Sequence, residues 1–185
     1  TIKKLKKKKF DVILLSYTFD HLQNPKDFLK NIKKILNKDG ILVIEVHDLD
    51  KIFRNIEFCL FEHEHSIYLN RKTAKKLLAF LGFEIINFNI VSQRDRRANS
   101  LLFVAKLSNN RMENETKIAQ TNSLNFVEFK KNIKSGISNL NSFIEKAKIN
   151  GEKVAGYGAG GRGIMTLANM KNSNKLEFLL EKKPK

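Results

Sequence analysis

The first strongly apolar run of the chain is FDVILLS (10–16), a short stretch rich in strand formers that predicts a buried strand. After a polar loop, the pair Asn24-Pro25 is typical of a helix N-cap and first turn. The helix that this pair predicts ends near Asp39-Gly40. Its apolar face consists of Phe28, Leu29, Ile32, Ile35 and Leu36. ILVIEV (41–46) then predicts a second buried strand, so the chain opens with a βαβ unit and a parallel sheet.

The later pattern predicts a second α/β part after a break. RKTAKKLLAFLGF predicts a helix that ends at Gly82, and FEIINFNIV and SLLFVAKL predict two strands. The inward face of that helix consists of Ala74, Leu77, Leu78 and Leu81. Residues 108–122 have no periodicity and predict a linker between a part at 1–107 and a part at 123–185.

The second part begins with a long amphipathic helix. Its predicted apolar stripe is Leu124, Val127, Ile133, Ile137, Leu140, Ile144 and Ala147. EKVAGYGAGGRGIMTLANM then predicts a strand, a glycine-rich turn and a helix, and LEFLLE (176–181) predicts another strand.

Composition narrows the class of protein. The chain has 185 residues, 42% hydrophobic and 29% charged, which suits a folded domain with a real core. The formal net charge is +16, but lysine is abundant along the whole chain and no zinc-finger or RNA-binding motif occurs, so we expect no nucleic-acid partner. The single cysteine, Cys59, excludes an internal disulfide, and no apolar run approaches the length of a membrane span. We expect a cytoplasmic protein with no membrane partner, and the oligomeric state stays open.

A dense run of ionisable residues, FEHEHSIY (61–68), is the first candidate for chemistry. Histidine has an ordinary pKa near 6.5, which suits general base catalysis, and an adjacent carboxylate would fix its tautomer. His63 and His65 lie two residues apart and could share a metal, but the run offers no clear third ligand, so we assign no metal residue. A solvated loop is the other alternative.

A glycine-rich loop, GYGAGGRG (156–163), is the second candidate. It contains G-x-G-x-x-G in two overlapping frames between a predicted strand and a predicted helix, as dinucleotide-binding loops do. Alone it suggests NAD, with Glu177 or Glu181 as the ribose-binding acid. A tight turn without a ligand is the alternative.

The order of these elements resembles a known family. FDVILLS, Asp20-His21, Asn24-Pro25, Lys38-Asp39-Gly40 and ILVIEV resemble the central part of class I S-adenosylmethionine-dependent methyltransferases. The His-Glu-His run followed by GYGAGGRG is similar to the sugar C-methyltransferases, which act on nucleotide-linked keto-sugars. The resemblance implies a partial class I methyltransferase (Rossmann-like) sheet followed by the start of a second α/β domain.

The resemblance also implies roles for residues. It makes His65 the base that removes a proton α to a ketone, Glu64 its partner or a substrate ligand, and His63 a supporting group. The family places a tyrosine where this chain has Glu62, whereas Tyr68 matches a later tyrosine. The substrate-binding residues implied are Glu62, Tyr68, Gly158, Gly160, Gly161 and Arg162. The residues implied at the cofactor S-adenosylmethionine are Ser16, Tyr17 and His21.

The family carries further parts that this sequence does not contain. They are an N-terminal cysteine domain, where zinc is possible, and the main cofactor loop, so we interpret the chain as an internal fragment. The expected partner is a small nucleotide-sugar. Two other functions stay open, an NAD-dependent nucleotide-sugar oxidoreductase and a non-enzymatic binding module, and the acceptor atom could also be oxygen or nitrogen.

Overall fold

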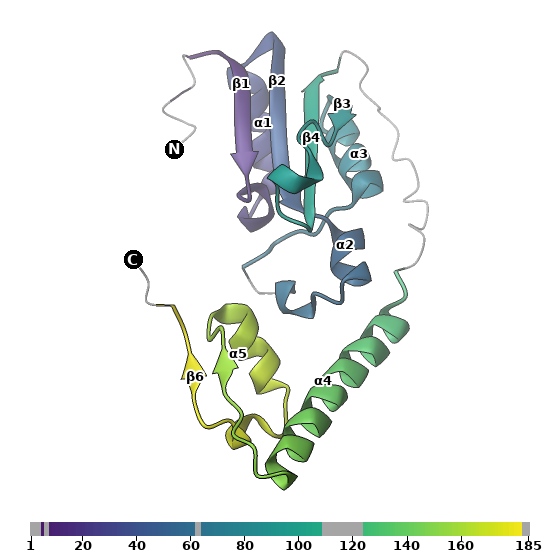
Figure 1. The fold of residues 1–185 in the computed structure, drawn as a ribbon. Helices are drawn as coiled ribbons and strands as arrows, with labels where there is room; N and C mark the ends of the chain where they lie inside the picture. The colour runs from purple at the N-terminus through teal and green to yellow at the C-terminus, as the bar shows by residue number, and fades with distance from the viewer. Residues whose placement is uncertain (1–4, 6–7, 62–63, 109–123, 183–185) are drawn as a thin grey trace. The chain divides into compact units, whose positions relative to one another are not determined.

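The computed structural model describes residues 5, 8–61, 64–108 and 124–182 and forms two compact units (Figure 1). The first unit consists of described residues within 1–54 and 63–124, and the second of those within 55–62 and 125–185. The predicted linker, apart from Ser108, lies outside the described residues, so the domain boundaries stay a prediction. Within the described ranges, no helix combines the length and apolar character needed to cross a membrane.

The first unit begins with the predicted βαβ arrangement. Strands β1 (Phe10–Ser16) and β2 (Leu36–His47) are parallel neighbours, and helix α1 (Pro25–Ile35) connects them. The side chain of Asn24 accepts a hydrogen bond from the backbone N–H of Asp27 at 3.0 Å, which confirms the predicted cap.

The boundary between α1 and β2 differs from the prediction. The helix ends at Ile35, and Leu36 already has an extended conformation with φ −82° and ψ 136°. Phe10 of β1 pairs with Leu36, whereas Val12 pairs with Ile41, so β2 carries extra residues at an irregularity opposite the start of β1. Leu36 is therefore buried as a strand residue, although its spacing also fits the apolar face of the helix.

The remaining elements extend the sheet with antiparallel strands. After α2 (Leu49–Arg54) and α3 (Arg71–Phe80), strands β3 (Phe83–Phe88) and β4 (Ser100–Leu107) give the order β1-β2-β4-β3. β4 is antiparallel to both β2 and β3. Gly82 has φ +75°, a left-handed conformation that glycine adopts easily, and it follows α3 as predicted.

The main core lies on one face of this sheet. Alternate residues of β2 and β4 pack in one cluster with the inward sides of α1 and α3. This cluster includes Leu29, Ile32, Leu42, Ile44, Val46, Ala74, Leu78, Leu101, Phe103 and Ala105. Val43, Leu102 and Val104 form a smaller cluster from the intervening positions. The predicted α/β class is confirmed, but the sheet is mixed: only β1 and β2 have the predicted parallel pairing, and β4 and β3 are antiparallel.

The second unit contains the predicted helix, strand and glycine-rich loop. Its elements are α4 (Phe126–Ile149), β5 (Gly156–Tyr157), α5 (Gly161–Ala168) and β6 (Leu179–Leu180), and β5 pairs with β6 in parallel. The backbone N–H of Asn172 donates to the side chain of Asn141 at 2.9 Å, which joins α4 to the segment before β6.

The apolar stripe predicted for α4 is partly wrong. Val127 is 82% exposed and Leu140 is 44% exposed, whereas Phe129, which the stripe omits, is buried. Ile144 and Ala147 are buried as predicted. The ring of Phe129 lies 5.8 Å from the ring of Phe61, which follows the short 3₁₀ helix Phe58–Leu60 and belongs to this unit. A distant segment therefore decides which side of α4 is covered.

Candidate functional site

The first candidate site lies where β1 and β2 end. Parallel strands present their carboxyl ends at one edge of a sheet, and ligands of open α/β sheets bind at this edge. Ser16, the last residue of β1, pairs in register with Glu45 of β2. Tyr17 follows with φ 43°, a conformation that is rare for a bulky residue and that turns the chain out of the sheet. The strand ends thus bring Ser16, Tyr17, Glu45 and His47 to one edge.

Glu45 is the hydrogen-bond acceptor for several hydroxyl groups at this edge. Its carboxylate accepts hydrogen bonds from Ser16 Oγ at 3.2 Å, Tyr17 Oη at 3.3 Å and Ser100 Oγ at 2.8 Å. Burial raises the pKa of Tyr17 above its ordinary value, so its hydroxyl stays protonated and donates. The guanidinium of Arg97 lies 4.2 Å from the centre of the Tyr17 ring.

Beside this group, Asp20 and His47 form a buried pair. Asp20 Oδ2 lies 3.0 Å from His47 Nδ1, and the two residues are 3% and 7% exposed. Burial alone would raise the pKa of Asp20, but the hydrogen bond and charge of His47, together with the charge of His21, lower it. The carboxylate is therefore ionised near neutral pH and can only accept, so His47 Nδ1 carries the hydrogen.

His65 lies in a cluster of rings next to this pair. The centre of its ring is 4.6 Å from that of His21, 5.1 Å from that of His47 and 5.7 Å from that of Tyr68. The backbone N–H and Oγ of Ser66 donate to the carbonyl oxygen of Asp20 at 2.7 and 3.0 Å, which holds the segment after His65 against the loop after β1. The structure thus brings together His65, Tyr68 and His21 from distant parts of the sequence.

Other residues of the predicted run are not placed in this way. Glu64 is exposed, and Glu62 and His63 lie outside the described residues. Among the described residues, the group with spacing suited to a metal ion consists of Asp20, His21 and His65, whose potential ligand atoms all lie within 4.8 Å of one another.

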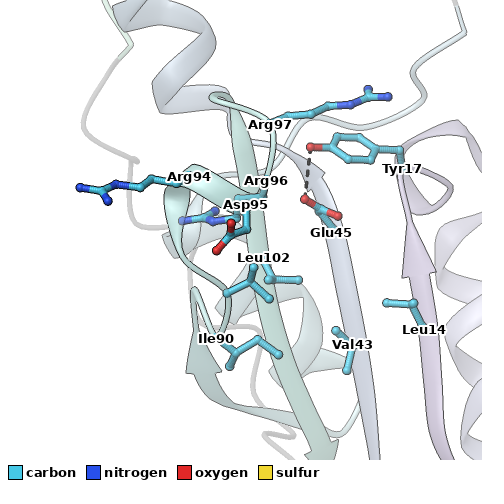
Figure 2. A pocket seen from close by; sticks show the side chains of 11 residues that line it. Leu14, Tyr17, Val43, Glu45, Ile90, Arg94, Asp95, Arg96, Arg97 and Leu102 are labelled. Atoms are coloured by element: carbon cyan, nitrogen blue, oxygen red, sulfur yellow. Dashed lines mark hydrogen bonds between the residues drawn. The ribbon is translucent and has the colours of Figure 1, made fainter.

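Tyr17 and Glu45 also line a cleft of about 690 Å³ (Figure 2). Leu14, Val43, Ile90 and Leu102 form its apolar wall, and Tyr17, Glu45 and the segment Arg94–Arg97 form its polar rim. Arg96 donates from Nη1 to the backbone oxygen of Ser100 at 2.9 Å and is half-buried, whereas Arg94, Asp95 and Arg97 are exposed.

The second candidate site is the glycine-rich loop between β5 and α5. Gly158 has φ +101°, and a Cβ atom at Gly163 would lie 1.8 Å from the backbone oxygen of Gly158. The frame Gly158, Gly160, Gly163 thus has the tight turn and the close approach of helix to loop that dinucleotide-binding loops require. Gly160 is the N-cap of α5, and Gly161 and Arg162 begin the helix, both exposed.

The two acids proposed for ribose recognition differ in position. A carboxylate oxygen of Glu181, just after β6, would lie 3.7 Å from a Cβ atom built on Gly160, so Glu181 adjoins the loop. Glu177 instead pairs with Lys148 of α4 at 2.6 Å, and this pairing lowers its pKa.

Three residues of the first site, Asp20, Glu45 and His47, are not among the site residues that the sequence predicts. Asp20 occurs only as part of the family pattern Asp20-His21. Their position along the chain could have indicated them, because each lies at or just after the carboxyl end of a predicted strand.

Comparisons with known proteins place the chain among methyltransferases. No curated protein matches it. Solved structures that are similar to part of the chain include a 1,6-didemethyltoxoflavin-N1-methyltransferase of Burkholderia thailandensis, a S-adenosylmethionine-dependent methyltransferase of Clostridium acetobutylicum and a magnesium protoporphyrin IX methyltransferase of Synechocystis.

Their similarity to the chain is low. The identities are 18%, 11% and 14%, with TM-scores of 0.42, 0.42 and 0.39. The matches cover 54%, 55% and 55% of this chain and 44%, 59% and 46% of those chains, so the matched part spans about half their length.

Two family models cover nearly all of the sequence. Residues 3–87 match a methyltransferase domain, and residues 89–185 match the C-methyltransferase C-terminal domain. The second match alone spans slightly more than half of the chain, and the two follow each other in the order that the sequence predicted. The chain therefore belongs to the C-methyltransferase family.

Proposed function

We propose that the protein transfers a methyl group from S-adenosylmethionine to a carbon atom of a nucleotide-linked keto-sugar. The observation that carries this proposal is a cluster of imidazole rings around His65 at the carboxyl edge of the sheet, in a chain whose second half matches a C-methyltransferase domain. Carbon methylation needs a base, because the α-proton must leave before the carbon can attack.

The residues at the sheet edge suit the cofactor. Ser16, Tyr17 and Glu45 supply hydroxyl groups and a carboxylate next to the ionised Asp20. This donor set fits a cationic ligand that carries ribose hydroxyls. When bound, S-adenosylmethionine supplies the methyl group on a positively charged sulfur. Ser16, Tyr17 and His21 would hold it at the end of β1.

His65 is the proposed base. The α-carbon–hydrogen bond would break, its proton would go to a ring nitrogen of His65, and the electron pair would form an enolate. The enolate carbon would then take the methyl group as the methyl–sulfur bond breaks, with the electron pair of that bond left on sulfur. Tyr68, with its ring beside that of His65, would contact the sugar. His63 keeps the supporting role that the family resemblance implies, and Glu62 and Glu64 keep the role of substrate ligands.

The glycine-rich loop would bind the nucleotide end of the substrate. Backbone N–H groups at the start of a helix favour anions, so Gly158, Gly160 and Gly161 would face the diphosphate. Arg162, exposed in the first turn of α5, would add positive charge.

The test is solvent deuterium exchange into a nucleotide-linked keto-sugar by the full-length protein. We expect the wild type to exchange the α-proton, and His65→Asn to exchange it at least about 100-fold more slowly. The control is Asp39→Asn, which changes an exposed acid outside the site. Exchange that persists undiminished in His65→Asn would remove His65 as the base.

One observation favours a second candidate, an NAD-dependent nucleotide-sugar oxidoreductase. Glu181 adjoins Gly160, as a ribose-binding acid of a dinucleotide loop should. If this candidate is right, the chain binds NAD and Glu181→Gln weakens that binding at least about tenfold, while Glu177→Gln leaves it unchanged. Absence of NAD binding together with deuterium exchange would favour the methyltransferase.

A further inference from the structure

The carboxylate best placed to stabilise a positive charge on His65 is that of Asp20, which lies 45 positions away in sequence. Asp20 is 3% exposed, whereas Glu64, the neighbour of His65 in the run, is exposed to solvent. A charge interaction is stronger where water is excluded, so a buried carboxylate affects a nearby imidazole more than an exposed one does.

The two oxygens of Asp20 have different surroundings. Oδ2 accepts the hydrogen of His47 Nδ1 at 3.0 Å. Oδ1 is buried and, within the described ranges, has no hydrogen-bond partner, and the same holds for Nε2 of His47. Buried polar atoms nearly always have partners, and unpartnered ones are found at functional sites. Among the described residues, this pair therefore has an acceptor oxygen and a ring nitrogen that no protein contact uses.

Distances place His65 within reach of this charge. Asp20, His21 and His65 each offer an atom within 4.8 Å of the other two, and opposite charges at 4–6 Å favour the charged forms of both groups. The titratable groups around the cluster are Tyr17, His21, His47 and Tyr68, and Glu45 accepts a hydrogen bond from Tyr17. A carboxylate oxygen of Asp20 lies within 4.8 Å of a ring nitrogen of His65, so Asp20 can offset a positive charge on His65.

We propose that Asp20, and not Glu64, is the positioning carboxylate for proton transfer at His65. It holds His47 in one tautomer through Oδ2, so that this ring packs against His65 in a fixed orientation. It also stabilises the imidazolium that forms when His65 takes the α-proton, while itself staying ionised. The proposal deepens the proposed function and rests on His65 as the base.

The direct test is an NMR titration of the 185-residue chain that follows the ring signals of its four histidines. In Asp20→Asn we expect the ring signals of His65 to change and the Nδ1–H signal of His47 to lose its carboxylate-bound shift. Glu64→Gln and the exposed control Asp39→Asn should leave the ring signals of His65 close to those of the wild type. A larger change in Glu64→Gln than in Asp20→Asn overturns the proposal.

A second measurement keeps the test decisive if Asp20→Asn does not fold. In the wild type, the carboxyl carbon of Asp20 should show a second inflection at the pH where His65 titrates, and its absence contradicts the proposal. Stoichiometric loss of the His21 and His65 signals on adding micromolar Zn²⁺ would instead make the cluster a cation site and overturn the positioning role.

Kinetics separate this inference from the proposed function. In the full-length protein Asp20→Asn should lower kcat roughly 10- to 100-fold with KM nearly unchanged, because the charge acts on the proton-transfer step. If the wild type does not methylate any keto-sugar, the proposed function fails while the titration still decides the role of Asp20. If the wild type is active and Asp20→Asn keeps its kcat, the inference alone fails.

Discussion

At the scale of single residues, Asp48 makes the stability of the fold depend on pH. It lies just after β2, is 8% exposed, and accepts a hydrogen bond from the backbone N–H of Asp50 at 3.1 Å. Burial raises its pKa above the ordinary value of 3.8. The folded protein thus holds this proton more tightly than the unfolded chain does, and the resulting stability is lost as pH rises through the folded pKa.

Asp48→Asn should therefore be more stable than the wild type at pH 7, by roughly 0.5–1 kcal/mol, because no buried charge forms in the variant. The gain should shrink as pH falls toward the ordinary value of 3.8. Urea unfolding at several pH values measures it, with Asp39→Asn as the exposed control. An Asp48→Asn variant less stable than the wild type at pH 7 would contradict this expectation.

Asp20 has the opposite dependence on pH. Its pKa is lowered, so its ionised carboxylate stabilises the fold above pH 3.8, and this stabilisation is lost on acidification.

The same scale shows what residue patterns could predict. The family resemblance implies Ser16 and His21 at the cofactor and His65 and Tyr68 at the substrate, and the structure brings the rings of His21 and Tyr68 next to that of His65. The pairing of Asp20 with His47 was not predicted, since it depends on the register of β1 with β2 and on burial, which no local pattern states. The resemblance gives Glu64 as the partner of His65 or as a substrate ligand, and this role stays a prediction.

At the scale of elements, two glycines of the second unit should respond oppositely to alanine. Gly136 lies inside α4, and an added Cβ would meet no atom within 4 Å. Gly136→Ala should therefore stabilise the helix by about 0.5–1 kcal/mol. At Gly163 an added Cβ would lie 1.8 Å from the backbone oxygen of Gly158, so Gly163→Ala should cost roughly 1–3 kcal/mol. Thermal unfolding followed by circular dichroism compares the pair, and equal effects would show that the loop does not approach α5 so closely.

The ends of helices and strands are harder to predict from sequence than whether a segment is a helix or a strand. Apart from α2 and the short 3₁₀ segments, the strands and helices were predicted as to type from periodicity. However, β2 begins at Leu36 because Phe10 pairs with it, which is a contact between strands. The apolar stripe predicted for α4 assumes that one continuous face of the helix is buried, whereas Val127 and Leu140 are exposed. Hydrophobic spacing describes which faces a helix could bury, and the partner decides which it does bury.

At the scale of the whole molecule, the second unit is completed by residues 55–62 from the first half of the sequence. Cys59 Sγ lies 3.5 Å from the backbone oxygen of Arg162 and 3.5 Å from Thr166 Oγ1, both in α5. Phe61 contacts Phe129 of α4 at a ring separation of 5.8 Å. The chain thus leaves the first unit after Arg54 and returns to it at the start of the histidine run.

Removing the Phe61 ring should therefore loosen the second unit and leave the first intact. We expect Phe61→Ala to speed amide hydrogen exchange in α4 and α5, by an amount equivalent to about 1–2 kcal/mol, because the half-buried ring loses its packing on Phe129. Exchange in β1, β2 and β4 should not change. Phe88→Ala is the matched control, since Phe88 packs at 6.0 Å on Phe103 of β4 and its loss should affect the first unit only. If Phe61→Ala instead speeds exchange in the sheet, residues 55–62 are part of the first unit, and the glycine-rich loop folds without them.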